Sequence, residues 1–298
     1  MRRESLLVLV LTRRCDRRCG FCPQEFSDAD MAPDVLDAAI SGLLPRLAAR
    51  PRVKLFGGEP MLRPDLVARA LDAVSRAAPR AVVELSTHGG ALAAGPGPLA
   101  GRARLEVFAS RPIPAAARLP GAVLNILLAP GESVVATVAR VARGRAAGFR
   151  RFNFLPAYFT RWSAGELARL RERFAATRRI LERLAERGDL VEVVNLCRAS
   201  STPLYNDGLV VDCDGEVYSS NVMLAAAVAP RKAELRLGHI GEPLEKAACA
   251  TSADVVARSV PSDVLAATFA ADALLSEFCR NMDAANLGRR AAGEAGAC

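Results

Sequence analysis

The sequence predicts an α/β protein in which buried strands alternate with helices over the first half of the chain. Six short segments are almost continuously apolar, as is typical of parallel strands that are buried on both faces. Longer segments between them carry apolar residues at helical offsets. This alternation indicates parallel βαβ units, and six units are too few for a complete eightfold barrel.

The expected strands are bounded by glycine, proline and polar residues, which mark turns. They are Leu6–Thr12, Val53–Phe56, Ala81–Ser86, Leu105–Ala109, Val123–Leu128 and Arg151–Leu155. Helices are expected where Pro33, Asp65 and Ser133 suit a first helical turn or an N-cap. They are Pro33–Ala48, Asp65–Ala78 and Ser133–Ala147, whereas Ala91–Arg104 is rich in Gly and Pro and is expected to be loose.

A different pattern follows residue 160. A long amphipathic helix is expected over Ser163–Arg187, and Val191–Asn195 is expected to form one more strand. Leu209–Val211 and Val217–Tyr218 flank an Asp-Gly pair, which predicts a β-hairpin. From about Val222 the tail is rich in alanine and is expected to be helical.

The length and composition of the chain exclude several classes of protein. The chain has 298 residues, enough to bury a core, and it contains no run of 18 apolar residues, so a membrane span is not expected. The first residues, MRRESLLVLVLTRRC, lack a small-residue cleavage site, and we interpret them as the first strand rather than a signal peptide. A cytoplasmic location is therefore expected, where eight cysteines favour metal or redox chemistry over disulfides.

The net charge of +8 comes almost entirely from arginine, because the only lysines are Lys54, Lys232 and Lys246. Nucleic-acid binders often gather basic residues on one face or interleave them with aromatic residues. Here the arginines are scattered, and the densest group, from Arg161 to Arg187, alternates with glutamates at helical spacing. This pattern does not favour a nucleic-acid substrate, whereas the excess charge suits an acidic electron donor or an anionic peptide.

A cluster of cysteines follows the first expected strand. Cys15, Cys19 and Cys22 lie on one short polar loop, with Phe21 directly before the last of them. Three thiolates on one loop can bind one face of an iron–sulfur cluster or a metal, because sulfur ligands favour iron and zinc. A cubane cluster held by three cysteines keeps one iron open, as a catalytic metal requires. A structural zinc site completed by a distant fourth ligand and a disulfide framework are the alternatives.

The motif Gly57-Gly58-Glu59-Pro60 follows the second expected strand, although such a tetrapeptide alone is also an ordinary turn. The C-x3-C-x2-C spacing with its aromatic residue, together with GGEP at this place, resembles the radical S-adenosylmethionine (radical SAM) superfamily. The resemblance implies a partial (β/α)6 TIM-like barrel over residues 1–160, with residues 161–298 as a C-terminal α+β cap. The chemistry of such barrels sits at the C-terminal ends of the strands, where the cysteine loop and GGEP both lie.

The same resemblance implies two cofactors, a [4Fe–4S] cluster on Cys15, Cys19 and Cys22 and S-adenosylmethionine (SAM) on the open iron. It implies reductive cleavage of SAM to methionine and a 5′-deoxyadenosyl radical, which takes a hydrogen atom from the substrate. The residues expected to contact SAM are Phe21, Gly57, Gly58, Glu59 and Pro60. The glycines admit close approach of the methionine moiety, and Glu59 accepts hydrogen bonds from its ammonium group. For Phe21 a place in the core is the alternative.

Four further polar residues are candidates for SAM binding. Ser86 and Thr87 lie at a strand end, where their hydroxyls can bind the cofactor or cap a turn. Asn125 and Asn153 interrupt two apolar strands, and a buried amide must be hydrogen-bonded, either to the cofactor or to the backbone. His88 is interpreted as an ordinary loop residue and His239 as a structural residue.

The second half of the chain has a weaker resemblance. Cys197, the hairpin around Cys213 and the segment Phe278-Cys279-Arg280 resemble the SPASM-type extension of peptide-modifying radical SAM enzymes, which carries auxiliary clusters. The pattern departs at Ser220 and Met282, where cysteines are expected, so we expect a degenerate extension without an auxiliary cluster. Cys197 and Cys213 are the candidate catalytic residues, as donors of a hydrogen atom or proton, and a buried inert thiol is the alternative.

The sequence thus predicts an enzyme that acts on a peptide or a small metabolite. A reductant such as flavodoxin or ferredoxin and a precursor-peptide-binding partner are expected partners. Two alternatives remain open: a non-catalytic protein that binds zinc or nucleic acid, and an activase that places a glycyl radical on a partner enzyme.

Overall fold

A computed structural model of the chain describes residues 5–189, 191–197, 207–244 and 250–284 and confirms the α/β class. The chain forms two compact units, each built from separate stretches of sequence. The first unit contains residues 1–108, 119–121 and 204–260, and the second contains residues 109–118, 122–203 and 261–298. These units follow contacts rather than sequence order, and the division into residues 1–160 and 161–298 stays a prediction.

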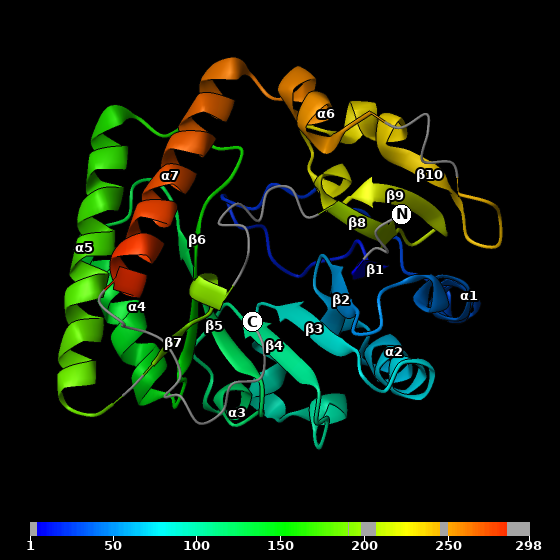
Figure 1. The fold of residues 1–298 in the computed structure, drawn as a ribbon, viewed down its shortest axis with the longest axis horizontal. Coiled ribbons are helices and arrows are strands. Elements are labelled where there is room, and N and C mark those ends of the chain that lie inside the picture. Colours follow the sequence, from blue (N-terminus) through cyan, green and yellow to red (C-terminus); the bar gives the residue numbers. More distant parts are fainter. Residues whose placement is uncertain (1–4, 190, 198–206, 245–249, 285–298) are drawn as a thin grey trace. The chain divides into compact units, whose positions relative to one another are not determined.

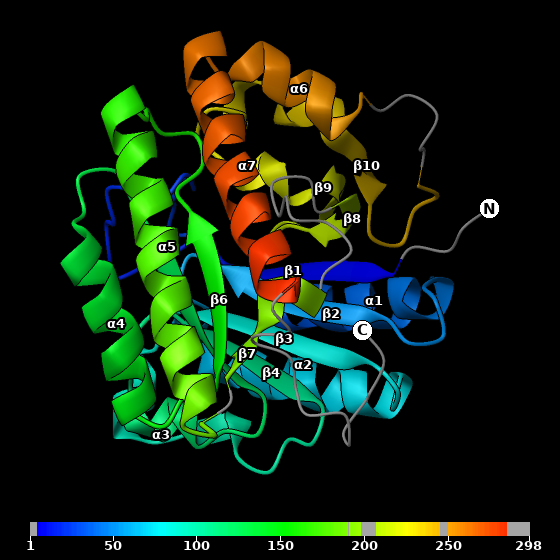
Figure 2. The same cartoon turned by 60° about the vertical axis from the view of Figure 1, so that its left-hand side comes forward.

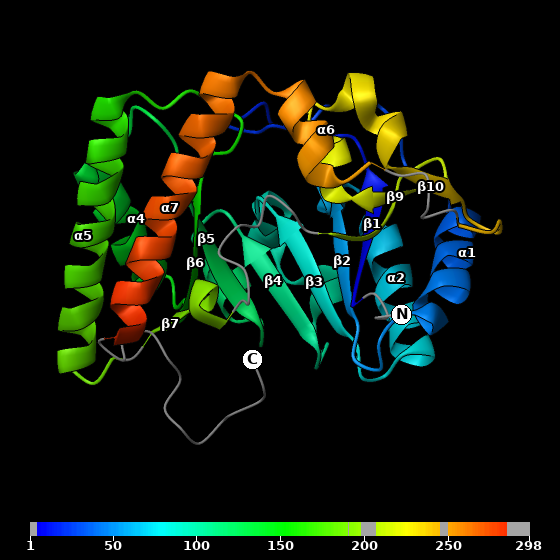
Figure 3. The same cartoon turned by 45° about the horizontal axis from the view of Figure 1, so that its top comes forward.

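The first unit is built on parallel strands that begin with β1 (Leu6–Thr12). This strand is apolar and almost completely buried, and it pairs in parallel with β2 (Arg52–Gly57), as Leu9 opposite Leu55 illustrates. The sheet continues through β3 (Val82–Thr87) to β4 (Leu105–Ala109). Figure 3 shows β3, β2 and β1 side by side, with α1 (Pro33–Leu43) and α2 (Pro64–Ala77) packed next to them.

The other edge of β1 is covered by a strand from far along the chain. β8 (Asp207–Val211) pairs with β1 in parallel, with Leu7 opposite Leu209, and then forms an antiparallel hairpin with β9 (Glu216–Ser220). Gly215 has a φ of 84° in the hairpin turn, a conformation that favours glycine. The predicted hairpin is confirmed, and its place beside the first strand closes that edge of the parallel sheet.

The prediction of a helical tail was wrong at β10 (Arg236–His239), which pairs antiparallel with β9. Leu237 is buried while Arg236 is exposed, so this short segment alternates as a strand on an available sheet edge. Beyond it the tail is helical as predicted, in α6 (Ser252–Ser259) and α7 (Ser262–Ala284).

The second unit contains three strands in the order β5 (Ala122–Leu128), β6 (Arg151–Pro156) and β7 (Glu192–Val193), all parallel. Besides the short helix α3 (Pro114–Ala117), this unit contains the longer helices α4 (Val134–Ala146), α5 (Ala164–Glu186) and α7. Figures 1 and 2 show α5 between α4 and α7. Phe278 of α7 fixes this packing, because its ring lies 5.3 Å from the ring of Phe154 and 4.9 Å from that of Phe174.

Capping residues lie at the ends of the two long helices α4 and α5. The Ser133 hydroxyl accepts a hydrogen bond from Ala136 N and caps α4. Ser163 and Glu166 form a reciprocal capping box at the start of α5, and Gly188 with a φ of 73° follows its end.

Short elements replace some of the predicted ones. The helix expected to reach Ala48 ends at Leu43, and a 3-10 turn (Leu44–Arg46) takes over at Pro45, which cannot continue the α-helix. Only β7 forms within Val191–Asn195, and a 3-10 turn (Val194–Cys197) follows it. The remaining short helices are η2 (Pro60–Leu62), η3 (Gly90–Ala94), η4 (Gly97–Leu99), α3 (Pro114–Ala117), η7 (Asn221–Leu224) and η8 (Ala229–Leu235). Within the described ranges no helix has the length and apolar character needed to cross a membrane.

Candidate functional site

The three predicted ligands lie on the loop between β1 and α1, which we call the cysteine loop (residues 13–30). All three thiols are free and half-buried, and Cys22 N donates a hydrogen bond to Cys19 O at 3.0 Å. Burial raises the pKa of both Cys15 and Cys22, and the nearby charge of Cys19 raises both further. The thiols therefore lie close enough to influence one another, at the C-terminal end of the first strand.

The donor set of this loop fits an iron–sulfur cluster, because it offers three free thiols on adjoining turns and soft sulfur ligands favour iron. Within the described residues, no group of three or more His, Cys, Asp or Glu side chains is already gathered as a metal site requires.

The GGEP motif is bound to the backbone at the end of β1 and the start of the cysteine loop. Gly58 N donates to Thr12 O at 2.9 Å, and Glu59 N donates to Arg14 O at 2.8 Å. A Cβ atom added to Gly57 would lie 2.1 Å from Thr12 O, and one added to Gly58 would lie 2.1 Å from Arg14 O. The sequence predicts that these glycines admit a cofactor, but in this structure the backbone of Thr12 and Arg14 approaches them so closely.

The Glu59 carboxylate is buried and already bound within the protein. Its Oε1 accepts hydrogen bonds from Met61 N at 3.0 Å and from Thr87 Oγ1 at 2.7 Å. Its Oε2 accepts from His88 N at 2.7 Å and lies 3.3 Å from His88 Nε2. A carboxylate has about four acceptor positions, so this side chain has little capacity left for an ammonium group. Pro60 is buried directly after it, at the first position of η2.

His88 connects this carboxylate to the cysteine loop. Its Nδ1 accepts from Gly90 N at 2.9 Å, so Nε2 carries the proton and donates to Asp16 Oδ1 at 2.7 Å. Asp16 lies between Cys15 and Cys19 in the sequence. The sequence analysis missed this contact, and the signal that could have found it is the position of His88 at a strand end beside Thr87.

Ser86 and Thr87 point in opposite directions, because successive side chains alternate along β3. Thr87 is buried against Glu59, whereas Ser86 is half-buried and takes part in no side-chain hydrogen bond among the described residues. Phe21 is half-buried between the last two cysteines. Of these three predicted contacts, Ser86 and Phe21 remain open to a ligand, and Thr87 has its partner in Glu59.

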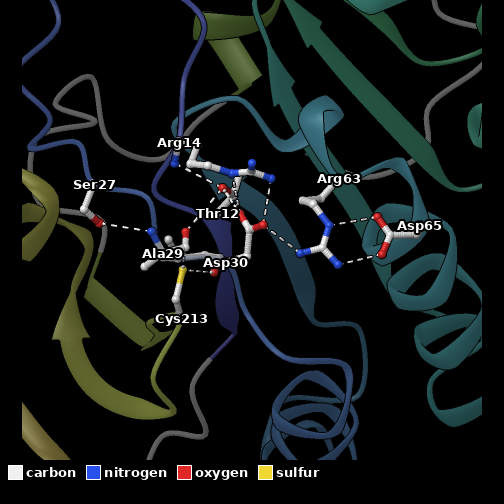
Figure 4. A network of polar contacts seen from close by, with 9 residues as sticks. Thr12, Arg14, Ser27, Ala29, Asp30, Arg63, Asp65 and Cys213 are labelled. Atoms are coloured by element: carbon white, nitrogen blue, oxygen red, sulfur yellow. Dashed lines mark hydrogen bonds and ion pairs between the residues drawn. The ribbon is translucent and has the colours of Figure 1, made fainter.

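A network of charged residues closes the base of the loop, as Figure 4 shows. Asp30 accepts hydrogen bonds from Thr12 Oγ1 at 2.5 Å, from Arg14 Nη2 at 2.7 Å and from Arg63 Nη1 at 2.9 Å. Arg63 also forms a two-point pair with Asp65, in the first turn of α2. Burial acts to raise the pKa of Asp30, but the hydrogen bonds from Thr12, Arg63 and Arg14 lower it overall. Both ends of the cysteine loop are thereby tied to α2.

Asn125 and Asn153 lie in the second unit, on adjacent strands and in register. Asn153 Nδ2 donates to Asn125 Oδ1 at 2.9 Å, so the two amides bind each other. Asn153 Oδ1 is buried and accepts no hydrogen bond in the described part of the chain. This acceptor needs a donor from water or a ligand, which fits the predicted role of Asn153 as a polar contact.

Cys213 has the surroundings of an inert thiol. It is buried, and its Sγ lies 3.2 Å from Val10 O and 3.7 Å from Ala29 O, to which it donates. Burial, helped by the charge of Asp212, raises the pKa of Cys213 to about 12. The thiol therefore stays protonated at neutral pH, which favours the structural alternative over a catalytic one. Cys197 ends the turn after β7, and its side chain lies outside the described residues, as does the terminal Cys298.

Comparisons with known proteins find similarity in structure but not in sequence. No family model and no curated protein matches the chain. Among solved structures, a hexahistidine-tagged anSMEcpe with bound AdoMet (SAM) has a TM-score of 0.64 at 13% identity, covering 86% of this chain and 82% of that one. A native anSMEcpe with bound AdoMet and Cp18Cys peptide has a TM-score of 0.61 at 13% identity, covering 94% and 98%.

A more partial match is SuiB of Streptococcus suis bound to the precursor peptide SuiA, with a TM-score of 0.54 at 13% identity. It covers 75% of this chain and 61% of that chain. At these identities the likeness concerns the fold. The chain thus has the α/β fold of proteins that have been solved with AdoMet or with a peptide.

Proposed function

We propose that this protein is a radical SAM enzyme that holds a [4Fe–4S] cluster on Cys15, Cys19 and Cys22. With SAM bound, such a cluster supplies reductive cleavage to methionine and a 5′-deoxyadenosyl radical, which takes a hydrogen atom from a substrate. The observation that carries the proposal is the cysteine loop itself, with three free thiols at the C-terminal end of β1. Its backbone pairing with Gly58 and Glu59 supports it further.

The chain's own residues have distinct roles in this proposal. Glu59 orients Thr87 and His88 rather than contacting SAM through its carboxylate. Polar contacts to SAM then fall to backbone groups around Gly58 and to the Ser86 hydroxyl. Half-buried Phe21 offers an apolar ring beside the cysteines, suited to stacking on adenine.

A peptide is the substrate class we propose, with a small metabolite as the second candidate. Two structures of the same fold were solved with peptides, Cp18Cys and the precursor SuiA. The net charge of +8 suits an anionic peptide and an acidic reductant such as flavodoxin or ferredoxin. A precursor-peptide-binding partner and a cytoplasmic location complete the proposal, and the free thiols of the described cysteines fit a reducing compartment.

Anaerobic purification followed by reconstitution with iron and sulfide tests the proposal. We expect a brown protein with roughly four irons per chain, and 5′-deoxyadenosine after SAM and dithionite are added. Replacing Cys22 with alanine should abolish both results. A colourless protein with one tightly bound zinc would instead identify the structural alternative, and copurification of a large partner enzyme would identify an activase.

A further inference from the structure

The C-terminal segment Asp207–Ala226 contacts the cysteine loop on both sides of the three cysteines. Before them, Arg13 Nε donates to Asp212 Oδ1 at 2.9 Å and Arg13 Nη2 donates to Asp212 Oδ2 at 2.7 Å. Both side chains are almost fully buried, with exposed fractions of 8% and 6%. Such a two-point pair fixes the orientation of both partners, and each charge depends on the other for compensation.

After the cysteines the contact is made by the backbone. Glu25 N donates to Leu224 O at 2.9 Å, and Ala226 N donates to Pro23 O at 2.8 Å. These bonds form an antiparallel bridge centred on Gln24 and Ala225. The backbone that directly follows Cys22 is therefore paired with the segment that follows the hairpin β8–β9.

A third contact holds the end of the loop. Cys213 Sγ donates to Ala29 O, and Ala29 O also accepts a hydrogen bond from Arg13 N at 2.8 Å. The start and the end of the loop thus meet at Arg13 and Ala29. The hairpin turn contacts both, through Asp212 to Arg13 and through Cys213 to Ala29. Figure 4 shows Cys213 beside Ala29 at this point.

From these contacts we propose that the segment Asp207–Ala226 is a brace that positions the cysteine loop for cluster binding, with Asp212 as its central positioning residue. The inference rests on the proposed function, because it takes this loop to be the cluster loop. It assigns the extension a role at the primary cluster that needs no further cysteine. Ser220, which stands where the SPASM-type pattern has a cysteine, is consistent with such a role: it is buried and its hydroxyl accepts from Val222 N.

The variant Asp212→Asn tests the brace, with Glu192→Gln as its matched control. Glu192 forms a similar two-point pair with Arg151, but in the second unit. In the cluster-free protein, Asp212→Asn should make the amides of residues 13–30 exchange with deuterium about tenfold faster than in wild type or the control, because a braced segment opens less often. After reconstitution it should hold less iron and show an altered electron paramagnetic resonance spectrum with SAM.

Unchanged exchange across residues 13–30 in a folded Asp212→Asn variant would overturn the brace. The same conclusion holds if its iron content and spectrum equal those of the Glu192→Gln control. If Asp212→Asn does not fold, Ala226→Pro removes only the donor to Pro23 O and should speed exchange next to Cys22; unchanged exchange there counts against the brace. If wild type assembles no cluster, the proposed function fails, while the exchange comparison still decides whether the brace exists.

Discussion

Thr87 donates its hydroxyl to the Glu59 carboxylate at 2.7 Å, so two side chains predicted as separate cofactor contacts bind each other. Through His88, the same carboxylate is linked to Asp16 on the cysteine loop. The GGEP motif and the end of β3 therefore act together on the shape of the loop. The GGEP motif therefore has a structural role in this protein that does not depend on a bound cofactor.

Replacing Glu59 with glutamine should destabilise the protein by about 1–3 kcal/mol, because an amide NH2 cannot accept a hydrogen bond, so either His88 N or Met61 N would lose its acceptor. Urea denaturation of the cluster-free protein measures the change. Thr87→Ser is the comparison: it keeps the hydroxyl that donates to Glu59 and accepts from Gly89 N, loses only a methyl group, and should cost about 1 kcal/mol. Equal stability of Glu59→Gln and wild type would show that the carboxylate is not needed for this network.

Replacing Gly58 with alanine should displace the cysteine loop, because the new Cβ would lie 2.1 Å from Arg14 O. Overpacking of this kind costs about 1–3 kcal/mol, and here it should also reduce the iron bound after reconstitution. Iron content and thermal unfolding are the measurements. Gly42→Ala is the matched control, because a Cβ added at this position of α1 would meet no atom within 4 Å outside the helix's own backbone. This variant should gain about 0.5–1 kcal/mol in helix stability.

The sequence predicted those parts of the fold that depend on local patterns. The strands of the first half, the cap at Ser133 and the hairpin turn at Gly215 all follow from short-range rules. The short strand β10 was missed, because its pairing depends on an edge offered by β9 and not on its own composition.

The contacts that hold the candidate site could not be predicted in the same way. Arg13 and Asp212 are 199 positions apart, and nothing in their local sequence indicates that β8 lies beside β1. The Glu59 carboxylate accepts hydrogen bonds from Met61 N and Thr87 Oγ1, and these likewise depend on where η2 and β3 place the two donors. Residue type and spacing predict the candidate ligands, whereas the contacts that position them depend on tertiary structure.

Thiol labelling should separate the cysteine loop from Cys213. In folded, cluster-free protein at about pH 8, iodoacetamide should modify Cys15, Cys19 and Cys22, which are half-buried, well before Cys213, which is buried with a pKa raised to about 12. Peptide mass spectrometry against time measures the rates, and labelling in urea gives the reference for the unfolded chain. Rapid labelling of Cys213 in the folded protein would contradict its structural role and restore it as a catalytic candidate.

The buried thiol of Cys213 also predicts how stability depends on alkaline pH. Its pKa is raised from 9.0 to about 12 by burial, so the folded chain keeps a proton that the unfolded chain loses. Its contribution is therefore complete below pH 9 and is lost as the pH rises toward 12, with a slope of up to about 1.4 kcal/mol per pH unit. Urea denaturation between about pH 8 and pH 11 should show this decline in wild type and a shallower one in Cys213→Ala.

Tyr158 accounts for part of the decline that remains in Cys213→Ala, because its pKa is also raised by burial and by the charge of Asp272. Tyr158→Phe should therefore reduce the decline further. Parallel curves for wild type and Cys213→Ala would mean that the thiol is ionised as easily in the folded chain as in the unfolded one, and the burial argument would fail.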